Sequence, residues 1–356
     1  MTSELSNFAA RLRALILQKP SPLDERQFGK LALEQFALQF AHNAPYRLIC
    51  EARGASPKTI EHWTQIPAVP TSAFKEMELS SIPAEERTAV FHSSGTTEQR
   101  PSRHFHCAES LAVYETSLWQ WFEANLRCTI CDLRILTPAP HQVPHSSLVH
   151  MFEVIRSKLG ASESVFLGNV GHDGVWTLDF IKTIEALDPK PGTQNPKLIL
   201  GTAFSFVHLI DYMEERNMKL VLPVGSRVME TGGYKGRSRT MPKAELHGLI
   251  TERLGVPQSH ILCEYGMSEL SSQAYQTMDR AYSFPPWARV QMVSPETGRA
   301  VEPGETGLLR IFDLANVFSV MAIQTEDLAI CWSDNFELVG RAQESEARGC
   351  SLMNSR

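Results

Sequence analysis

The chain has 356 residues, of which 43% are apolar and 21% are charged, an ordinary composition for a globular protein. Its formal net charge of −6 argues against nucleic acid or an anionic membrane surface as the main partner. No segment approaches the ~20 apolar residues that a membrane span needs, and charged residues interrupt the N-terminal segment too often for a signal peptide. The seven cysteines are scattered, so we expect reduced thiols in a cytoplasmic protein, with Cys128 and Cys131 as structural thiols rather than a zinc site.

Short apolar runs alternate with helical stretches through most of the chain. Apolar residues spaced three and four apart predict helices at 3–17 and 27–42. Further along, strand-like runs end in turn or polar residues, and helical stretches separate them. This alternation predicts an α/β fold of mixed, mostly parallel sheets flanked by helices. The expected strands are 133–138, 164–169, 197–204, 219–233 and 260–269, and the expected helices are 108–126, 146–159, 178–187 and 204–217.

The last part of the chain has a different pattern. Residues 287–341 contain short strand-like runs joined by turns, as in "VEPGETGLLRIFDLA", which predicts antiparallel strands. We therefore expect one large domain over residues 1–340, with an antiparallel β subdomain at about 285–340. Residues 341–356 are expected to form a flexible C-terminal tail.

Three glycine-containing polar loops follow strand-like runs, where ligands bind in open α/β sheets. The first, Ser93–Thr97, offers hydroxyl groups and backbone N–H donors of the kind that hold anionic oxygens. It lacks the GxxxxGK[ST] pattern of a P-loop, and a solvent-exposed Ser/Thr turn is the simpler alternative. The residues of this loop are Ser93, Ser94, Gly95, Thr96 and Thr97.

The second and third loops carry charged and aromatic side chains. In the second, Gly232 and Gly233 would let a flat ring or a phosphate approach the backbone, although the loop could simply turn the chain. In the third, "EYGMSE", Glu269 is a hard oxygen ligand suited to Mg²⁺, whereas the alternative is a helix start capped by Ser268. The histidines near these loops show no metal-ligand spacing, so we interpret them as hydrogen-bonded polar residues.

Taken in order, these loops resemble the motifs of the adenylate-forming superfamily, which includes acyl-CoA synthetases, adenylation domains and luciferases. Ser93–Thr97 is similar to the superfamily's phosphate loop, and Tyr265, Gly266, Met267, Ser268 and Glu269 match its Y-G-x-[ST]-E motif. Asp327 in "TEDLA" matches the aspartate that binds the ribose, and Gly340-Arg341 matches a later G-R pair. The resemblance implies ATP and Mg²⁺ as cofactors and a carboxylic acid as substrate.

A closer resemblance covers nearly the whole chain. The segments "IPAVPTSAFK", "SSLVHMF", "GTAFSFVHLID", "METGGYKGRSR" and "GRAQESEARGCSL" are similar to acyl-protein synthetases of the bacterial bioluminescence type. These enzymes supply acyl groups to a fatty acid reductase, and a cysteine near their C-terminus accepts the acyl group. The matching cysteine here is Cys350. The resemblance therefore implies a fatty acid substrate, an acyl-accepting protein as partner, and self-acylation on Cys350.

The chain departs from the superfamily in its phosphate loop and at its end. Glu98 stands where glycine is usual, and "RPSRH" stands where P-K is usual. The chain also ends soon after Gly340, where most members continue into a lid domain with a catalytic lysine. The lid is expected to be absent or reduced to the tail. Positive charge at the α-phosphorus would then come from Mg²⁺ on Glu269 together with Lys235 or Arg237.

The implied reaction has two steps. The acid attacks ATP to give an acyl-AMP, and the Cys350 thiolate, favoured by the nearby Arg348, then displaces AMP. Residues of "PHQVPHSSLVHMF", "GTAFSFVHL" and the segment before Ser226 are expected to line an apolar acyl pocket. Two alternatives stay open: a ligase that passes the acyl group to coenzyme A, a carrier protein or an amine, and a non-catalytic nucleotide-binding scaffold of a reductase complex. The favoured interpretation requires the loops, Asp327 and Cys350 to lie around a single bound adenylate.

Overall fold

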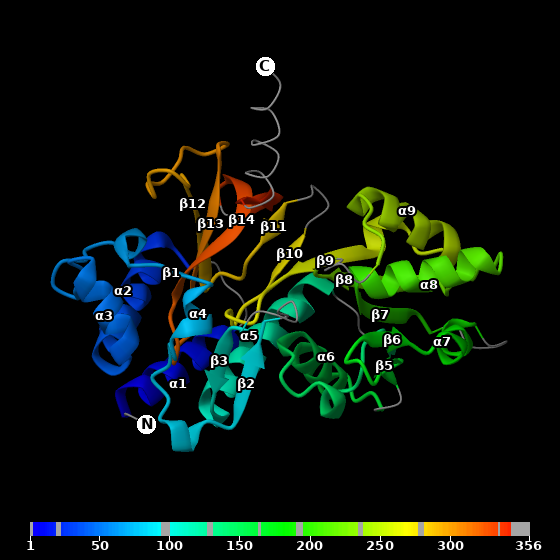
Figure 1. Cartoon of the computed structure of the whole chain (residues 1–356), viewed down its shortest axis with the longest axis horizontal. Helices are drawn as coiled ribbons and strands as arrows, with labels where there is room; N and C mark the ends of the chain where they lie inside the picture. The colour runs from blue at the N-terminus through cyan, green and yellow to red at the C-terminus, as the bar shows by residue number, and fades with distance from the viewer. Residues whose placement is uncertain are drawn as a thin grey trace. The chain divides into compact units, whose positions relative to one another are not determined.

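The computed structural model describes residues 3–18, 23–93, 100–126, 131–162, 165–189, 195–233, 238–276, 281–333 and 335–342 (Figure 1). The chain divides into two compact units. The first comprises Met1–Trp121, Met267–Ala274 and Asp279–Arg356, and the second comprises Phe122–Gly266 and Tyr275–Met278.

The second unit is built on a parallel sheet in the order β9-β8-β7-β4. Such strands are buried on both faces, and the run of β7 is accordingly apolar and fully buried. Helices α8 and α9 each connect one strand of this sheet to the next, and Figure 1 shows them side by side. The elements are β4 (Asp132–Ile135), α6 (Ser147–Lys158), β5 (Gly168–Val170), β6 (Trp176–Leu178), α7 (Phe180–Leu187), β7 (Lys197–Thr202), α8 (Ala203–Glu215), β8 (Arg227–Thr231), α9 (Lys243–Leu254) and β9 (Ile261–Tyr265).

The first unit contains an antiparallel sheet in the order β12-β13-β14-β15-β11, with β1 added in parallel to β14. A separate hairpin joins β2 to β3. The strands are β1 (Val69–Pro70), β2 (Ala89–His92), β3 (Arg103–His106), β11 (Tyr282–Ser283), β12 (Ala288–Val293), β13 (Thr306–Asp313), β14 (Ala322–Trp332) and β15 (Asn335–Arg341), and the helices are α1 (Ser3–Leu17), α2 (Glu25–His42), α3 (Ala44–Ala52) and α4 (Ala73–Glu76). Helix α5 (Ala108–Leu126) and strand β10 (Ala274–Gln276) each run across the boundary between the units.

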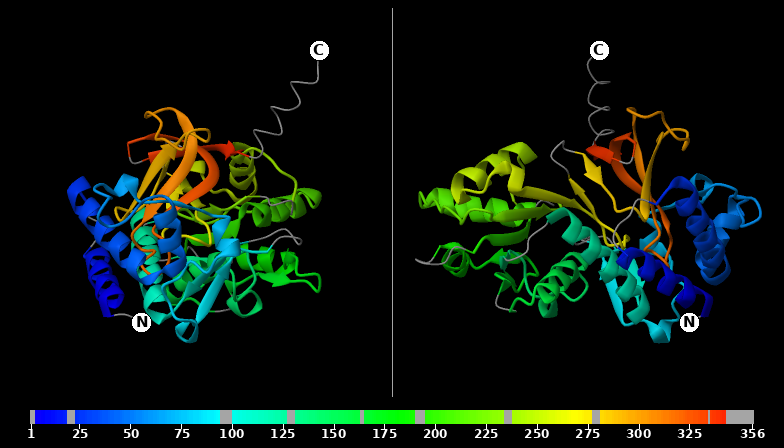
Figure 2. Two further views of the ribbon diagram at one scale, coloured as in Figure 1. Left: turned by 60° about the vertical axis from the view of Figure 1, so that its left-hand side comes forward. Right: turned by 180° about the vertical axis from the view of Figure 1, so that it is seen from behind.

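Helix α2 holds a loop of the first unit from its buried face. Asp24 and Gln27 form a capping box that starts the helix. Two buried glutamines then donate to the backbone oxygen of Asn316, Gln35 at 3.0 Å and Gln39 at 2.7 Å. Because buried carbonyl groups need partners, these bonds fix the loop between β13 and β14. Figure 2 shows the same helix and strands from two further directions.

The predicted fold class is confirmed, although some elements differ from the prediction. The segment 219–233 was expected to form one strand, but within it only the residues of β8 do. Pro223 and a left-handed Gly225 (φ 89°) interrupt the extended backbone before β8. Helix α9 was not predicted, since its polar residues and Gly248 weaken the apolar spacing. The bounds 1–340 and 341–356 for domain and tail stay a prediction.

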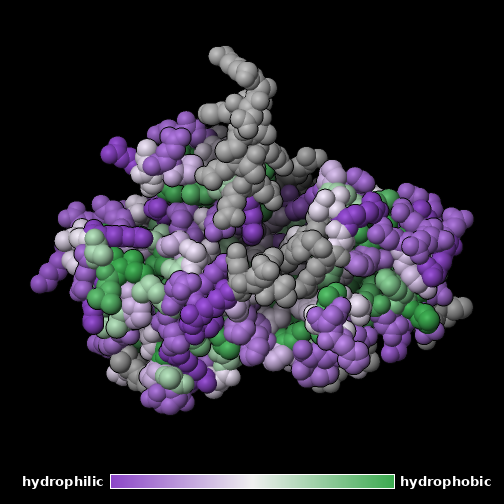
Figure 3. Space-filling view, in the orientation of Figure 1, coloured by the Kyte–Doolittle hydropathy of each residue, from purple (hydrophilic) through white to green (hydrophobic). Residues whose placement is uncertain are grey.

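The described surface carries its exposed apolar side chains among hydrophilic ones, as the face in Figure 3 shows. Among the described helices, none has the length and apolar character to cross a membrane. Cys50, Cys107, Cys263 and Cys331 form no disulfide bond. Cys131 is disulfide-bonded, so the expectation of a reduced thiol at this position is wrong.

Candidate active site

The predicted phosphate loop belongs to the connection between the two strands of a hairpin in the first unit. Strands β2 and β3 pair in antiparallel register, with Phe91 opposite His104. Ser93 continues the pairing, because its N–H donates to the Ser102 carbonyl oxygen at 3.4 Å and its Oγ accepts from the Ser102 N–H at 3.0 Å. The hairpin thus fixes the first residue of the loop, while Ser94, Gly95, Thr96 and Thr97 lie outside the described residues.

Ser268 of the first unit is contacted by Ser102 and His104, which lie 166 and 164 positions away in sequence. The hydroxyl groups of Ser102 and Ser268 lie 3.3 Å apart, and His104 Nδ1 lies 2.9 Å from the Ser268 carbonyl oxygen. Ser268 Oγ in turn donates to Glu269 Oε2 at 3.0 Å. The base of the phosphate loop and the Ser-Glu pair of the second motif therefore share one hydrogen-bonded network.

The segment around Glu269 is also held from its other side. Asn316 donates its side-chain N–H to the Glu269 carbonyl oxygen at 2.8 Å. Asp313 accepts the backbone N–H groups of Ser271 and Ser272 at 2.9 and 2.8 Å, and the Ser272 hydroxyl at 2.7 Å. Preorganised groups of this kind cost no reorganisation when charge develops during a reaction. The network therefore presents Glu269 in a fixed position.

Burial shifts the pKa values of two groups in this network. Removal from water lowers the pKa of His104 to about 4, so the imidazole is neutral and its Nδ1–H donates to the Ser268 carbonyl oxygen. For the Asp313 carboxyl, burial has the opposite effect and raises the pKa, although the hydrogen bonds from Ser272, Ser271 and Ala315 oppose that rise. The expectation that His104 is a hydrogen-bonded polar residue is confirmed.

Asp327 and Arg341 pair across neighbouring strands of the first unit. They are register partners on β14 and β15, and Arg341 Nε donates to Asp327 Oδ1 at 3.0 Å. Asp327 is partly buried, whereas the Arg341 side chain is 65% exposed. Asp327, predicted to bind the ribose, and Arg341 of the later G-R pair are thus brought together, with the arginine donating to the aspartate.

The glycine loop and the start of the "EYGMSE" motif belong to the second unit. Thr231 and Glu264 are register partners at the ends of β8 and β9, and the Thr231 hydroxyl donates to Glu264 Oε2. Gly232 follows with φ of 71°, a conformation that favours glycine. Gly233 follows Gly232, and Tyr265 is the last residue of β9. Gly266 comes directly after that strand, and the chain passes into the first unit at Met267. Lys235 and Arg237 lie outside the described residues.

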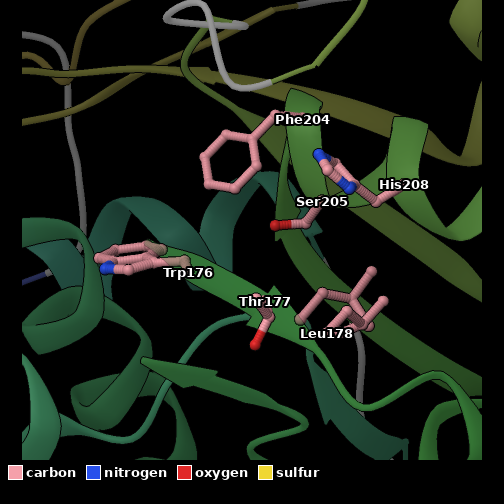
Figure 4. Close-up of a pocket in the computed structure, with 7 residues that line it drawn as sticks. Trp176, Thr177, Leu178, Phe204, Ser205 and His208 are labelled. Carbon is pink, nitrogen blue, oxygen red and sulfur yellow. The ribbon is translucent and has the colours of Figure 1, made fainter. Parts of the chain in front are cut away.

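A small pocket lies in the second unit between β6 and α8 (Figure 4). Phe204, Ser205 and His208 line it from α8, while Trp176 and Leu178 line it from β6. The first three belong to the segment "GTAFSFVHL" that was expected to line an acyl pocket. The segment 140–152, expected to do the same, supplies none of the lining residues.

Glu269 has the donor chemistry that Mg²⁺ prefers. Its carboxylate is buried and accepts from the Ser268 hydroxyl, which itself lies 3.3 Å from the Ser102 hydroxyl, so the local donors are hard oxygen atoms. Mg²⁺ in phosphate-transfer sites uses one or two carboxylates and completes its shell with water and phosphate oxygens. One fixed carboxylate therefore fits this ion. Cys350 and the rest of the tail from residue 343 lie outside the described residues.

Sequence reasoning from the motifs alone missed Ser102, Asn316 and Asp313. These residues act through backbone groups and hydroxyls of residues far away in sequence, with separations of up to 166 positions. The spacing of residues in the sequence does not predict such partners. The signal that could have found Ser102 is the departure "RPSRH", which replaces the superfamily's usual residues after the phosphate loop.

Comparison with known proteins places the chain in a family. The family model described as "Acyl-protein synthetase, LuxE" matches residues 12–356. A long-chain-fatty-acid–luciferin-component ligase of Aliivibrio fischeri is 23% identical over 346 residues, covering 91% of this chain and 86% of that protein. A ligase of the same name from Vibrio harveyi is 20% identical, covering 92% of this chain and 87% of that protein.

A solved structure shows the same fold. The open conformation of 2-hydroxyisobutyryl-CoA ligase, in complex with 2-HIB-AMP and CoA, aligns with a TM-score of 0.68 at 15% identity. The alignment covers 91% of this chain and 76% of that one. The fold is therefore that of adenylate-forming ligases, as the sequence predicted. Together with the family match, this shows that the chain belongs to the acyl-protein synthetase family LuxE, ligases that activate an acyl group and transfer it.

Proposed function

We propose that this acyl-protein synthetase activates a long-chain fatty acid with ATP and transfers the acyl group to its own Cys350. The curated relatives are named as long-chain-fatty-acid ligases, which supports the substrate class. The single observation that carries the proposal is the network that joins Ser93 and Ser102 to Ser268 and Glu269. This network links the base of the predicted phosphate loop to the motif predicted to bind the metal.

In the first step, a carboxylate oxygen of the acid attacks the α-phosphorus of ATP. A P–O bond forms to the acid, the bond to pyrophosphate breaks, and the product is an acyl-AMP. Such a displacement needs positioning and charge neutralisation more than covalent help from the protein. Glu269 would hold Mg²⁺, which supplies positive charge to the phosphates, and Ser93–Thr97 would donate hydrogen bonds to their oxygens. Asp327, positioned by Arg341, would accept from the ribose hydroxyls.

In the second step, the Cys350 thiolate attacks the acyl carbonyl carbon. A C–S bond forms, the C–O bond to AMP breaks, and the thiol proton passes to solvent. Only the thiolate is an effective nucleophile, so a neighbouring cation such as Arg348 would assist. The thioester would then be delivered to an acyl-accepting protein such as a fatty acid reductase. The proposed location of the enzyme is the cytoplasm.

The test is the intact mass of the purified chain after incubation with ATP, Mg²⁺ and a panel of carboxylic acids. We expect a mass increase of one acyl group with long-chain acids, and its loss on treatment with hydroxylamine. Cys350→Ser should abolish the adduct and leave acid-dependent pyrophosphate exchange intact, while the control Cys331→Ser should keep both. Loss of exchange in Cys350→Ser, or an adduct that persists in it, would contradict transfer to Cys350. Transfer to added coenzyme A by both variants would favour a CoA ligase.

A further inference from the structure

A cluster of three potential metal ligands lies in the second unit, outside the groups assigned to the reaction. Glu230 on β8 and Cys263 on β9 are register partners in the parallel sheet. His247 comes from α9, the helix that connects these two strands. Glu230 and Cys263 are buried, and the His247 side chain is 14% exposed. Within the described ranges, this is the one group of at least three such side chains whose ligand atoms gather within 4.8 Å.

The distances in the cluster are those between ligands of one tetrahedral zinc ion. Cys263 Sγ lies 3.3 Å from Glu230 Oε2 and 3.5 Å from His247 Nε2, and His247 Nε2 lies 3.5 Å from Glu230 Oε2. Zinc bonds of about 2.3 Å to sulfur and about 2.0–2.2 Å to nitrogen and oxygen, at tetrahedral angles, place such ligand atoms about 3.4–3.6 Å apart. We propose that Glu230, His247 and Cys263 together bind one Zn²⁺ ion.

A network of hydrogen bonds explains the cluster less completely. Cys263 Sγ donates to Glu230 Oε2, and Cys263 Sγ and His247 Nε2 form a second hydrogen bond. Those two bonds leave the 3.5 Å approach of His247 Nε2 to Glu230 Oε2 to be explained by an ion pair or by a shared cation. Lys243 also hydrogen-bonds the Cys263 side chain, and it brings one positive charge to the surroundings of the buried carboxylate. A divalent cation would satisfy all three side chains together.

Metal binding would change the protonation of Cys263. Burial raises the pKa of the Cys263 thiol, and the Glu230 carboxylate raises it further, while Lys243 lowers it. The thiol is thus protonated at neutral pH when no metal is bound. Binding forms the Zn–S bond, breaks the S–H bond and releases that proton to solvent.

The position of the cluster gives the ion a structural role. Glu230 directly precedes Thr231 and the two glycines of the second loop, and Cys263 directly precedes Glu264 and Tyr265. Zn²⁺ would therefore fasten α9 to the ends of the two strands from which these loops leave. Three protein ligands leave a fourth coordination position, which water can occupy.

The test is metal content and metal titration of the full chain, independent of its ligase activity. We expect one Zn²⁺ per chain by elemental analysis after expression with zinc, loss of that ion to a strong chelator, and return on adding ZnCl₂. Zinc at about 100-fold above its dissociation constant should raise the Tm of the apoprotein by about 5 °C. CoCl₂ should give the near-ultraviolet charge-transfer absorption of a thiolate–cobalt bond.

Single substitutions identify the ligands. His247→Gln changes the most exposed of the three side chains and should weaken zinc binding by about 100-fold or more, because even residues outside the ligand shell change metal affinity by about 10–100-fold. Cys263→Ser should abolish the cobalt–thiolate absorption. The control Cys331→Ser removes a thiol of another part of the fold that forms no disulfide bond, and it should leave both properties unchanged.

Three results would overturn the proposal. One is wild-type protein with no zinc and no cobalt absorption. Another is zinc that survives in His247→Gln with its affinity unchanged. A third is cobalt absorption that disappears in Cys331→Ser. If Cys263→Ser does not fold, the variant His247→Cys decides the question, since it keeps three ligands and should retain zinc with a stronger cobalt–thiolate absorption.

Discussion

Glu269 and Asp327 are two carboxylates of the first unit that the superfamily resemblance assigns to one nucleotide, yet the structure holds them in opposite ways. Glu269 is buried, accepts a hydrogen bond from its neighbour Ser268, and has its backbone fixed by Asn316. Asp327, whose side chain is 14% exposed, accepts a hydrogen bond from Arg341, whose side chain is 65% exposed. A buried network sets a position before any ligand arrives, whereas an exposed ion pair sets it only weakly.

This difference gives the two carboxylates different expected roles. A group whose position is fixed in advance can stabilise charge that develops in the transition state. A group held by a solvent-exposed partner can adjust to a ligand and contributes mainly to its binding. Substitutions at Glu269 should therefore act on the rate of activation, and those at Arg341 on nucleotide affinity.

The largest effect is expected for Glu269→Gln. The amide keeps the shape and can still accept from Ser268, but it removes the charge that would hold Mg²⁺. We expect acid-dependent pyrophosphate exchange at saturating ATP to slow by about 10²–10³-fold, the usual cost of removing one preorganised electrostatic group. Glu337→Gln, an exposed carboxylate of β15, is the matched control and should exchange at the wild-type rate. A Glu269→Gln rate within twofold of wild type would remove Glu269 from the site.

The contrast between these carboxylates also shows what the sequence could predict. Ser268–Glu269 and Asp327 were found by resemblance, because the chemistry of each motif is local in sequence. The alternation of strands and helices gave the fold class for the same reason. The partners that fix Glu269 were not found, since Asn316 and Asp313 use a side chain to hold backbone atoms more than forty positions away. Such contacts depend on how α2 and the loop after β13 pack, which no periodicity encodes.

The second effect concerns pH, and it tests whether the network around Glu269 is buried as described. Burial lowers the pKa of His104 to about 4, from an ordinary value of 6.5. Between these two pH values the unfolded chain binds the proton and the folded chain does not, so the free energy of unfolding falls as pH is lowered through this window. The loss from this group reaches at most about 3 kcal/mol.

His104→Asn should remove this pH dependence while keeping a side-chain N–H near the Ser268 carbonyl oxygen. Urea unfolding at several pH values from 4 to 7 measures it, and the variant should show a shallower slope than wild type. His141→Asn changes an exposed histidine and serves as the control, with an unchanged slope. Equal slopes in His104→Asn and wild type would mean that His104 is hydrated and that the network around Ser268 is open to water.

The smallest effect is expected for Arg341→Ala. Arg341 donates to Asp327 from a largely exposed position, and exposed ion pairs contribute about 0–1 kcal/mol to stability. The free energy of unfolding should therefore fall by no more than about 1 kcal/mol. The loss of the partner should leave Asp327 less well oriented, so the KM for ATP should rise while the rate at saturating ATP changes little.

Arg341→Lys is the control variant, because it keeps the charge but loses the Nε–H that donates to Asp327. If the lysine variant has the KM of wild type, charge alone accounts for the role of Arg341; if it matches alanine, the directed hydrogen bond does. A saturating rate that drops as far as in Glu269→Gln would contradict the separation of roles between the two carboxylates.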